Sequence, residues 1–202
     1  MRSRQTNKPD KYIVSECVKV LRDELPYNLH IFVNSVEFIA KVIDTLKLAP
    51  EAVKVVCSTS GESRQENQRK LGNAYPIGQP SDPAKKINFY TSTCFEGCDI
   101  FDPDGVTFIV SDGRKAHTLL DISTLFTQIC GRIRDSRYKA QIVHVYSTTK
   151  YSKAVTLDEF VAATQRTLAD AESYAAEINS LSEATRVKTL SKIPYINEQY
   201  VR

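Results

Sequence analysis

The sequence lacks the features of membrane-spanning, secreted and zinc-ribbon proteins. No window approaches about 18 uninterrupted apolar residues, and the first eleven residues (MRSRQTNKPDK) include no apolar segment. Neither a spanning helix nor a secretory signal is therefore predicted. No two of the five cysteines have C-x-x-C spacing, which excludes a zinc ribbon or a redox pair of that kind. We expect an intracellular protein, in the cytoplasm or, for a eukaryotic or viral protein, the nucleus, whose thiols are reduced and mostly buried.

Three phosphate-binding motifs are also missing. None of the seven glycines is followed by Lys, so G-x-x-x-x-G-K-[ST] cannot be formed, and no two glycines are two residues apart, so G-x-G-x-x-G is missing as well. A cysteine phosphatase loop needs an arginine six residues after its nucleophile, and none stands there after Cys94, Cys98 or Cys130. The chain therefore has no P-loop, dinucleotide fingerprint or phosphatase loop of its own.

Composition and charge are those of an ordinary globular chain. Of the 202 residues, 42% are hydrophobic and 25% charged, which excludes disorder as the main state. The length fits one full domain with an appendage. Lys and Arg number 27 against 24 Asp and Glu, a net charge of +3. That surplus is too small for a general nucleic-acid-binding surface, although it is compatible with a local basic patch.

Apolar runs alternate with helical patterns along the first 150 residues. The runs that predict strands are 27–34, 53–57, 87–91, 106–111 and 141–146. N-cap signatures at Asn34-x-x-Glu37 and Ser63-x-x-Glu66 predict two helices, and apolar spacing predicts a third over 119–133. This alternation predicts an α/β fold with a doubly wound, mostly parallel sheet and helices on both faces.

Segments of different character flank this α/β domain. We predict an N-terminal linker and helix over 1–25, the α/β domain over 26–150 and a C-terminal helical extension over 151–202. The basic first residues (Arg2, Arg4, Lys8 and Lys11) are expected to be a disordered part of that linker, with contact to phosphate as the alternative. In the extension, Thr156-x-x-Glu159 predicts a capping box at the start of a long helix. Its apolar stripe comprises Phe160, Val161, Thr164, Leu168, Ala171, Ala175 and Ile178. This helix either packs on the α/β body or on a neighbour.

The first candidate ligand site follows the predicted strand 87–91, in TSTCFEGCD (Thr91 to Asp99). Small hydroxyl residues, a glycine and an acid lie there past the carboxyl end of a parallel strand, where α/β sheets bind their ligands. Free backbone amides and hydroxyls suit a phosphate, and an aspartate suits a ribose hydroxyl. A tight turn from strand to loop, without a ligand, is the alternative.

The second candidate site is QICGRIR (Gln128 to Arg134). On a helix, the polar residues Gln128, Gly131, Arg132 and Asp135 would share one face, within about 100° of one another, while their apolar neighbours face the core. Gly131 lowers helix propensity by about 1 kcal/mol and exposes backbone for the close approach of a ligand. Together with Arg134 and Arg137, this face predicts an anion site. A solvated helix surface is the alternative.

Taken in order, these segments resemble the C-terminal RecA-like domain of superfamily 2 helicases over about residues 27–147. IFVNSVEFIA resembles motif IV, VVCSTSGESRQENQRKL the next strand and its arginine-bearing helix, TSTCFEGCD motif V and QICGRIR motif VI. Asp135 stands where most members of that family have a further arginine, which leaves Arg134 and Arg137 as candidates. The G-R-x-R form is similar to that of replication-origin-binding helicases of large DNA viruses.

The resemblance implies a motor domain that acts on ATP bound to another domain. At that interdomain site it places Gln128, Gly97, Asp99, Gly131, Arg132 and one of Arg134 and Arg137. Arg132 would reach the γ-phosphate as an arginine finger, and Gly97 and Asp99 would couple nucleotide binding to domain closure. Most of the ATP and Mg²⁺ would be held by an N-terminal RecA-like domain of the same parent protein, because the P-loop and the Mg²⁺-binding carboxylates are missing here.

The resemblance also implies a nucleic-acid partner. Near its backbone it places Ser58, Thr59, Thr91 and Thr93. We expect single-stranded nucleic acid, DNA in preference to RNA, with no membrane partner and no metal site in this chain. The isolated chain is expected to be a monomer that does not hydrolyse ATP. The alternative function is that of a non-catalytic nucleic-acid-binding or scaffold domain of degenerate helicase ancestry.

Overall fold

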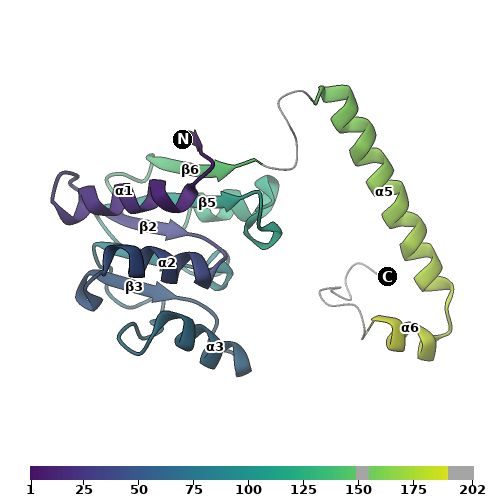
Figure 1. The fold of residues 1–202 in the computed structure, drawn as a ribbon, viewed down its shortest axis with the longest axis horizontal. Coiled ribbons are helices and arrows are strands. Elements are labelled where there is room, and N and C mark those ends of the chain that lie inside the picture. Colours follow the sequence, from purple (N-terminus) through teal and green to yellow (C-terminus); the bar gives the residue numbers. More distant parts are fainter. Residues whose placement is uncertain (149–154, 191–202) are drawn as a thin grey trace. The chain divides into compact units, whose positions relative to one another are not determined.

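The structure is a computed structural model that describes residues 1–148 and 155–190. It comprises two units, Met1–Lys150 and Tyr151–Arg202, which are drawn in Figure 1. The first unit is an α/β domain, and the described part of the second is helical.

A six-stranded parallel sheet forms the centre of the first unit. Its strands are β1 (Arg2–Gln5), β2 (Asn28–Phe32), β3 (Val53–Val56), β4 (Ile87–Tyr90), β5 (Gly105–Asp112) and β6 (Ile142–Ser147). Their order across the sheet is β1-β6-β5-β2-β4-β3. Within β2, Ile31 lies opposite Phe108 on one side and Phe89 on the other. Nearly all residues of β2, β4 and β5 are buried, as expected of parallel strands that are covered on both faces.

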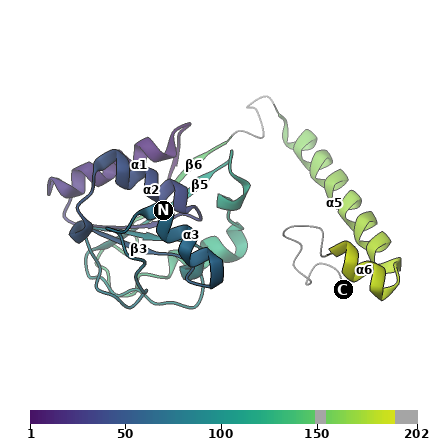
Figure 2. The ribbon, with the colours of Figure 1, turned by 60° about the horizontal axis from the view of Figure 1, so that its bottom comes forward.

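Helices cover both faces of this sheet. They are α1 (Pro9–Leu21), α2 (Val36–Leu46), α3 (Gly61–Leu71) and α4 (Thr127–Cys130). On one face α1 and α2 lie side by side (Figures 1 and 2) and pack Ile13 and other apolar side chains against Ile31. On the other face Ile129 of α4 packs near Phe32 of the central strand. The doubly wound parallel α/β fold predicted from the sequence is thus confirmed.

The first 21 residues include a strand of the sheet, β1, and a helix, α1, that packs on the core. The strand Arg2–Gln5 contains no apolar residue and is exposed along its length, so no hydrophobic pattern marks it. It is held by parallel pairing with β6, in which Arg2 lies opposite Val143. The following helix α1 buries Ile13 and Cys17 on one face. The expectation that the basic N-terminal residues form a disordered linker is therefore wrong.

The helix predicted over 119–133 is interrupted and ends early. A π-helical turn, Ile122–Phe126, leads into α4, which ends one residue before Gly131. Gly131 is the C-cap, with φ −98° and ψ 1°. The prediction that Gln128, Gly131 and Arg132 share one helical face is wrong, because Arg132 lies beyond the end of the helix. Glycine, with its low helix propensity, occupies the position at which the helix stops.

Two helices begin at a different residue from the one predicted. The N-cap of α2 is Ser35, whose hydroxyl accepts a hydrogen bond from the backbone N–H of Phe38 at 3.3 Å. Asn34, the predicted cap, makes other contacts, described below. Helix α3 has Ser60 as its N-cap, without a side-chain hydrogen bond, rather than Ser63.

The second unit contains α5 (Leu157–Ser180) and α6 (Glu183–Leu190). The predicted capping box is present: the hydroxyl of Thr156 accepts from the backbone N–H of Glu159 at 3.3 Å, and the Glu159 carboxylate accepts from the Thr156 N–H at 2.8 Å. Much of the predicted apolar stripe is exposed, with Leu168 59% exposed. None of the helices among the described residues is long and apolar enough to cross a lipid bilayer.

Candidate functional site

The two candidate ligand segments form one site. After β4, the chain passes through a 3₁₀ turn and a loop to Ile100, whose backbone N–H donates to the carbonyl of Arg132 at 2.9 Å. The backbone N–H of Arg134 donates in return to the carbonyl of Ile100 at 3.0 Å. This short parallel bridge joins Ile100 to Ile133, and both side chains are buried. The segments that resemble helicase motifs V and VI are therefore fixed to one another by backbone hydrogen bonds.

Arg132 is held by neutral oxygen atoms. Its Nε donates to the backbone carbonyl of Gln128 at 3.0 Å, and its Nη1 donates to the backbone carbonyl of Cys98 at 2.8 Å. Because α4 ends at Cys130, the carbonyl of Gln128 is free to accept this bond as well as one from the N–H of the C-cap residue Gly131. Within the described part of the chain, no carboxylate lies within 4.0 Å of the Arg132 guanidinium. Its position is fixed while its positive charge stays uncompensated.

The other two candidate arginines are paired with acids. Arg134 donates from Nε to a carboxylate oxygen of Asp99 at 2.8 Å, and both side chains are about half exposed. Arg137 forms an ion pair with Asp104, in the connection between β4 and β5. Exposed pairs of this kind contribute roughly 0.2–1 kcal/mol to stability. Arg132 thus differs from Arg134 and Arg137, because it has no charged partner among the described residues.

The two glycines and the glutamine of the site differ in their surroundings. Gly97 has φ +69°, a left-handed conformation that side chains rarely adopt. At Gly131 an added Cβ would lie 3.6 Å from the nearest heavy atom, the carbonyl oxygen of Gln128. Its backbone therefore does not require glycine. Gln128 is exposed, and its side-chain amide has no hydrogen-bond partner among residues 1–148 and 155–190.

The candidate nucleic-acid residues follow two neighbouring strands. Ser58 and Thr59 come after β3, while Thr91 and Thr93 come after β4. The backbone N–H of Thr91 donates to the carbonyl of Val56 at 3.0 Å, which ties the two strand ends together. Thr91 is buried, with its hydroxyl 3.3 Å from that of Thr93. Thr59 and Thr93 are exposed, so a ligand at this edge would meet these two hydroxyls first.

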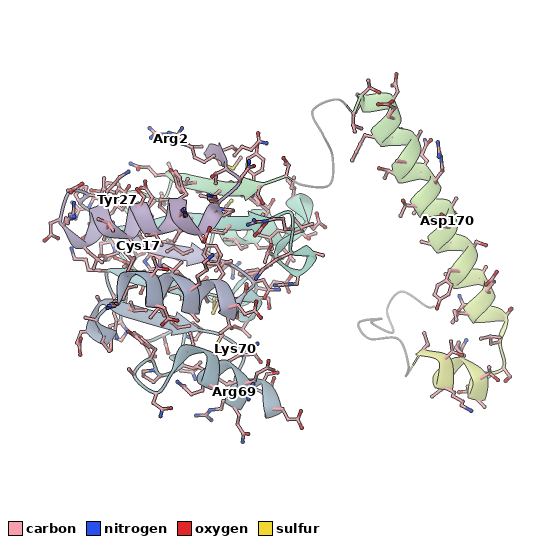
Figure 3. All side chains as sticks on the ribbon, viewed as in Figure 1. Arg2, Cys17, Tyr27, Arg69, Lys70 and Asp170 are labelled. Carbon is pink, nitrogen blue, oxygen red and sulfur yellow. The ribbon has the colours of Figure 1, made fainter. Side chains whose placement is uncertain are left out.

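Basic side chains lie on the helix that follows Thr59. Arg69 and Lys70, in the last turn of α3, are exposed and are labelled in Figure 3. Lys70 forms an ion pair with Glu66 at 2.7 Å. Because Glu66 offsets its charge, Lys70 adds little net positive charge to this helix.

Asn34, which was predicted to cap a helix, instead lies among the loops at the carboxyl ends of the strands. Its side-chain amide donates to the carbonyl of His117 at 2.9 Å and accepts from the backbone N–H of Ser92 at 3.3 Å. It therefore connects the end of β2 to the loops that follow β4 and β5. An asparagine directly after an apolar run is the signal for such a position, but it is also the signal for a helix cap.

A buried polar pair beneath the site was not predicted. His30 is fully buried, and its Nε2 lies 2.7 Å from a carboxylate oxygen of Asp102. Burial lowers the pKa of His30 despite this acid. Burial alone would raise the pKa of Asp102, but hydrogen bonds from His30 and Asn28 outweigh it and lower that pKa. A neutral His30 that donates from Nε2 to Asp102 and accepts at Nδ1 from the Tyr90 hydroxyl, 3.1 Å away, satisfies both contacts.

This pair holds the connection between β4 and β5 against the sheet. The backbone N–H of Asp104 donates to Asp102 at 2.9 Å. A Cβ on Gly105 would lie only 2.9 Å from Nε2 of His30, so glycine is required there by the close approach of the ring. Asp102 lies two residues after Ile100, which makes the bridge to the Arg132 segment. No local sequence pattern could show this pair, since β2 and the connection are far apart in the chain.

The described residues offer no metal centre. Across 1–148 and 155–190, no group of three or more His, Cys, Asp or Glu side chains is placed to hold a metal ion. Comparison of the sequence with protein-family models and with curated proteins finds no match.

Proposed function

We propose that this chain is the second motor domain of an ATP-dependent nucleic-acid helicase or translocase, in which Arg132 contacts ATP held by an N-terminal RecA-like domain of the same parent protein. The observation that supports this proposal is the state of the Arg132 guanidinium. It is fixed by two backbone carbonyls at 2.8 and 3.0 Å and has no carboxylate partner among the described residues.

Such an arrangement suits charge stabilisation on a phosphate. A guanidinium has five N–H donors, and the two carbonyls engage only Nε and one hydrogen of Nη1. The remaining donors are available for phosphate oxygens, and the charge is always present. A preorganised donor contributes to catalysis because it needs no rearrangement when charge develops on the transferred phosphoryl group.

The neighbouring residues receive distinct roles in this proposal. Arg134, paired with Asp99, couples the two ligand segments and would act as a second arginine finger only by exchanging Asp99 for phosphate. Gly97 and Gly131 allow the backbone to lie close to the nucleotide. Gln128, whose amide is without a partner among the described residues, would orient the phosphates or the attacking water. Mg²⁺ and the β-phosphate would be held by the partner domain, since the sequence contains no P-loop and residues 1–148 and 155–190 form no cluster of three or more His, Cys, Asp or Glu side chains for a metal ion.

The nucleic-acid track would cross the ends of β3 and β4. The exposed hydroxyls of Thr59 and Thr93, with Ser58 and Thr91 behind them, suit the sugar-phosphate backbone of a single strand, with DNA preferred to RNA. Contacts to the backbone position a strand without reading its sequence. Movement along such a strand requires contacts of this sequence-independent kind.

The decisive test uses the parent protein that contains both motor domains. We predict that Arg132→Ala lowers nucleic-acid-stimulated ATP turnover by about 10³- to 10⁵-fold, the range found for arginine fingers. Turnover and the melting temperature are measured together, because Arg132 is partly exposed and its loss should leave the fold intact. ATP affinity should change far less, since the other domain holds most of the nucleotide.

The matched control for this test is Arg22→Ala. Arg22 is an exposed arginine at the end of α1 and pairs with Glu24. Its removal should leave turnover unchanged. If Arg132→Ala melts normally and keeps more than about a tenth of the turnover, the motor proposal is wrong, and the non-catalytic scaffold alternative replaces it.

A further inference from the structure

Two cysteines are joined by a hydrogen bond within the segment that holds Arg132. Cys94 ends the 3₁₀ turn after β4, and Cys98 follows it by four residues. The Cys98 Sγ donates to the backbone carbonyl of Cys94 at 3.2 Å. Cys94 is fully buried, while Cys98 is partly exposed. A small oxidant can therefore reach one sulfur of the pair directly.

Cys98 is partly exposed, unlike the buried Cys94, Cys17 and Cys57. Burial raises the pKa of Cys94 and Cys17 to about 12 and that of Cys57 to about 11. Because the thiolate is the reactive form of cysteine, these three buried thiols are expected to react slowly by themselves. Cys98 is therefore the sulfur of the pair that meets an oxidant first, and Cys94 reacts as its neighbour.

Cys98 also holds the arginine of the candidate site. Its backbone carbonyl is the oxygen that accepts from Nη1 of Arg132 at 2.8 Å. The residue before it, Gly97, has a left-handed backbone at φ +69°. A disulfide to Cys94 would remove the hydrogen bond between the Cys98 Sγ and the Cys94 carbonyl, in the same residue whose carbonyl accepts from Arg132.

We propose that Cys94 and Cys98 are an oxidation site, at which a peroxide converts the two thiols to a disulfide and thereby withdraws the Cys98 carbonyl from Arg132. The formation of the disulfide depends only on the thiol pair. Its effect on turnover rests on the proposed motor function, because only there does the position of Arg132 matter.

The reaction balances with hydrogen peroxide as the oxidant. The Cys98 thiolate attacks one peroxide oxygen, the O–O bond breaks, and the leaving hydroxide takes a proton to become water, which leaves a sulfenic acid on Cys98. The Cys94 sulfur then attacks the Cys98 sulfur. The S–S bond forms, the S–O bond breaks, and the second hydroxide leaves as water with the proton of Cys94. Two electrons pass from the sulfurs to the peroxide, and a dithiol reductant reverses the change.

The first experiment measures disulfide formation in the 202-residue chain. Hydrogen peroxide at low molar excess should remove two of the five thiols, as counted after unfolding, and peptide mapping should find Cys94 joined to Cys98. Cys98→Ser should abolish this loss, while Cys130→Ser, at another partly exposed cysteine, should leave it unchanged. A disulfide between Cys98 and Cys130, or a persistent sulfenic acid on Cys98, would overturn the proposal.

The second experiment observes Arg132 in the same chain. Its Nε–H donates to the Gln128 carbonyl, and Nη1 of the same guanidinium donates to Cys98. The ¹H–¹⁵N signal of Nε–H, assigned with Arg132→Lys, should therefore shift when the disulfide withdraws the Cys98 carbonyl. It should return when a dithiol is added. The Nε–H of Arg137, which pairs with Asp104, serves as the internal reference and should stay in place. A disulfide that forms without moving the Arg132 signal contradicts the link between them.

The final experiment measures the parent protein. Peroxide should lower its stimulated ATP turnover at least tenfold, reversibly with a dithiol, and the Cys98→Ser parent should resist. Unchanged turnover in an oxidised parent whose Arg132→Ala variant is inactive would overturn the regulatory proposal alone. If Arg132→Ala is itself active, the motor function fails instead, and the thiol pair is judged by the first two experiments.

Discussion

Gly97 and Gly131 lie in the same candidate site, yet only Gly97 has a backbone conformation that favours glycine. Gly97 has φ +69°, whereas Gly131 has φ −98° and room for a Cβ. We predict that Gly97→Ala lowers the free energy of unfolding by about 1–2 kcal/mol, the cost of a left-handed residue with a side chain. Gly131→Ala should be neutral or slightly stabilising, because alanine restricts the unfolded chain. Urea unfolding of both variants measures this difference, and equal losses would contradict it.

The buried His30 predicts how stability depends on pH. Its pKa in the folded protein is lowered by burial from the ordinary value of 6.5, so below about pH 6.5 the unfolded chain binds more protons than the folded one. The free energy of unfolding should therefore fall as the pH drops through this window, by up to about 1.4 kcal/mol per pH unit for one such group. Asp102, whose pKa is also lowered, acts at more acidic pH.

His30→Gln tests this assignment by urea unfolding at a series of pH values. The variant is expected to be less stable at neutral pH and to have a shallower pH dependence between about pH 5 and 6.5. Some dependence should remain, because burial also lowers the pKa of His144. The control is His117→Gln, at an exposed histidine, which should retain the full slope. If the free energy of unfolding depends equally on pH in both variants, His30 is not the cause of that dependence.

At the scale of the element, two neighbouring polar residues at the start of α2 have different roles. Ser35 caps the helix, while Asn34 connects the loops after β4 and β5. We predict that Ser35→Ala lowers the free energy of unfolding by about 1 kcal/mol, the usual value of an N-cap hydrogen bond. Asn34→Ala should instead increase hydrogen exchange at the Ser92 amide, which donates to it. The reverse assignment of these two effects would show that Asn34 is the cap after all.

Strands with apolar runs could be predicted from the sequence, and the one without such a run could not. The predicted strand 27–34 corresponds to β2 and 106–111 corresponds to β5, because buried parallel strands need apolar side chains on both faces. The strand β1 depends on backbone pairing with β6 alone. Periodicity also could not show where the helix before Arg132 stops, because Gly131 and the bridge at Ile100 decide this together.

In the candidate site, too, some features could be predicted from the sequence and others could not. Arg132, Arg134 and Asp99 could be named from the sequence through a resemblance, which also placed them at one interdomain site, whereas the backbone bridge that joins the two ligand segments is visible only in the structure. The partners of Arg132 could not be named, since they are backbone carbonyls that depend on the end of a helix and on the path of a loop. The pair of His30 and Asp102 lay equally outside the range of local patterns.

At the scale of the whole molecule, the proposed track predicts weak binding of single strands by this chain. With one to three phosphate contacts at about −0.7 each, the logarithm of the binding constant should fall shallowly with the logarithm of the salt concentration. Fluorescence anisotropy with labelled oligonucleotides measures this slope, and DNA should bind more tightly than RNA. Thr93→Val should weaken binding several-fold, while Thr45→Val, on α2, should not. Tight binding that ignores salt or depends on base sequence would contradict the track.

The edge position of β1 has a consequence for the order in which the protein is made. Its first residues pair only with β6, with Arg2 opposite Val143, so β1 leaves the ribosome long before its partner exists. At about 5–20 residues per second, the delay is on the order of ten seconds. During that time β2, β4 and β5 can already assemble around their apolar residues. The strand that begins the chain is therefore among the last to reach its place in the sheet.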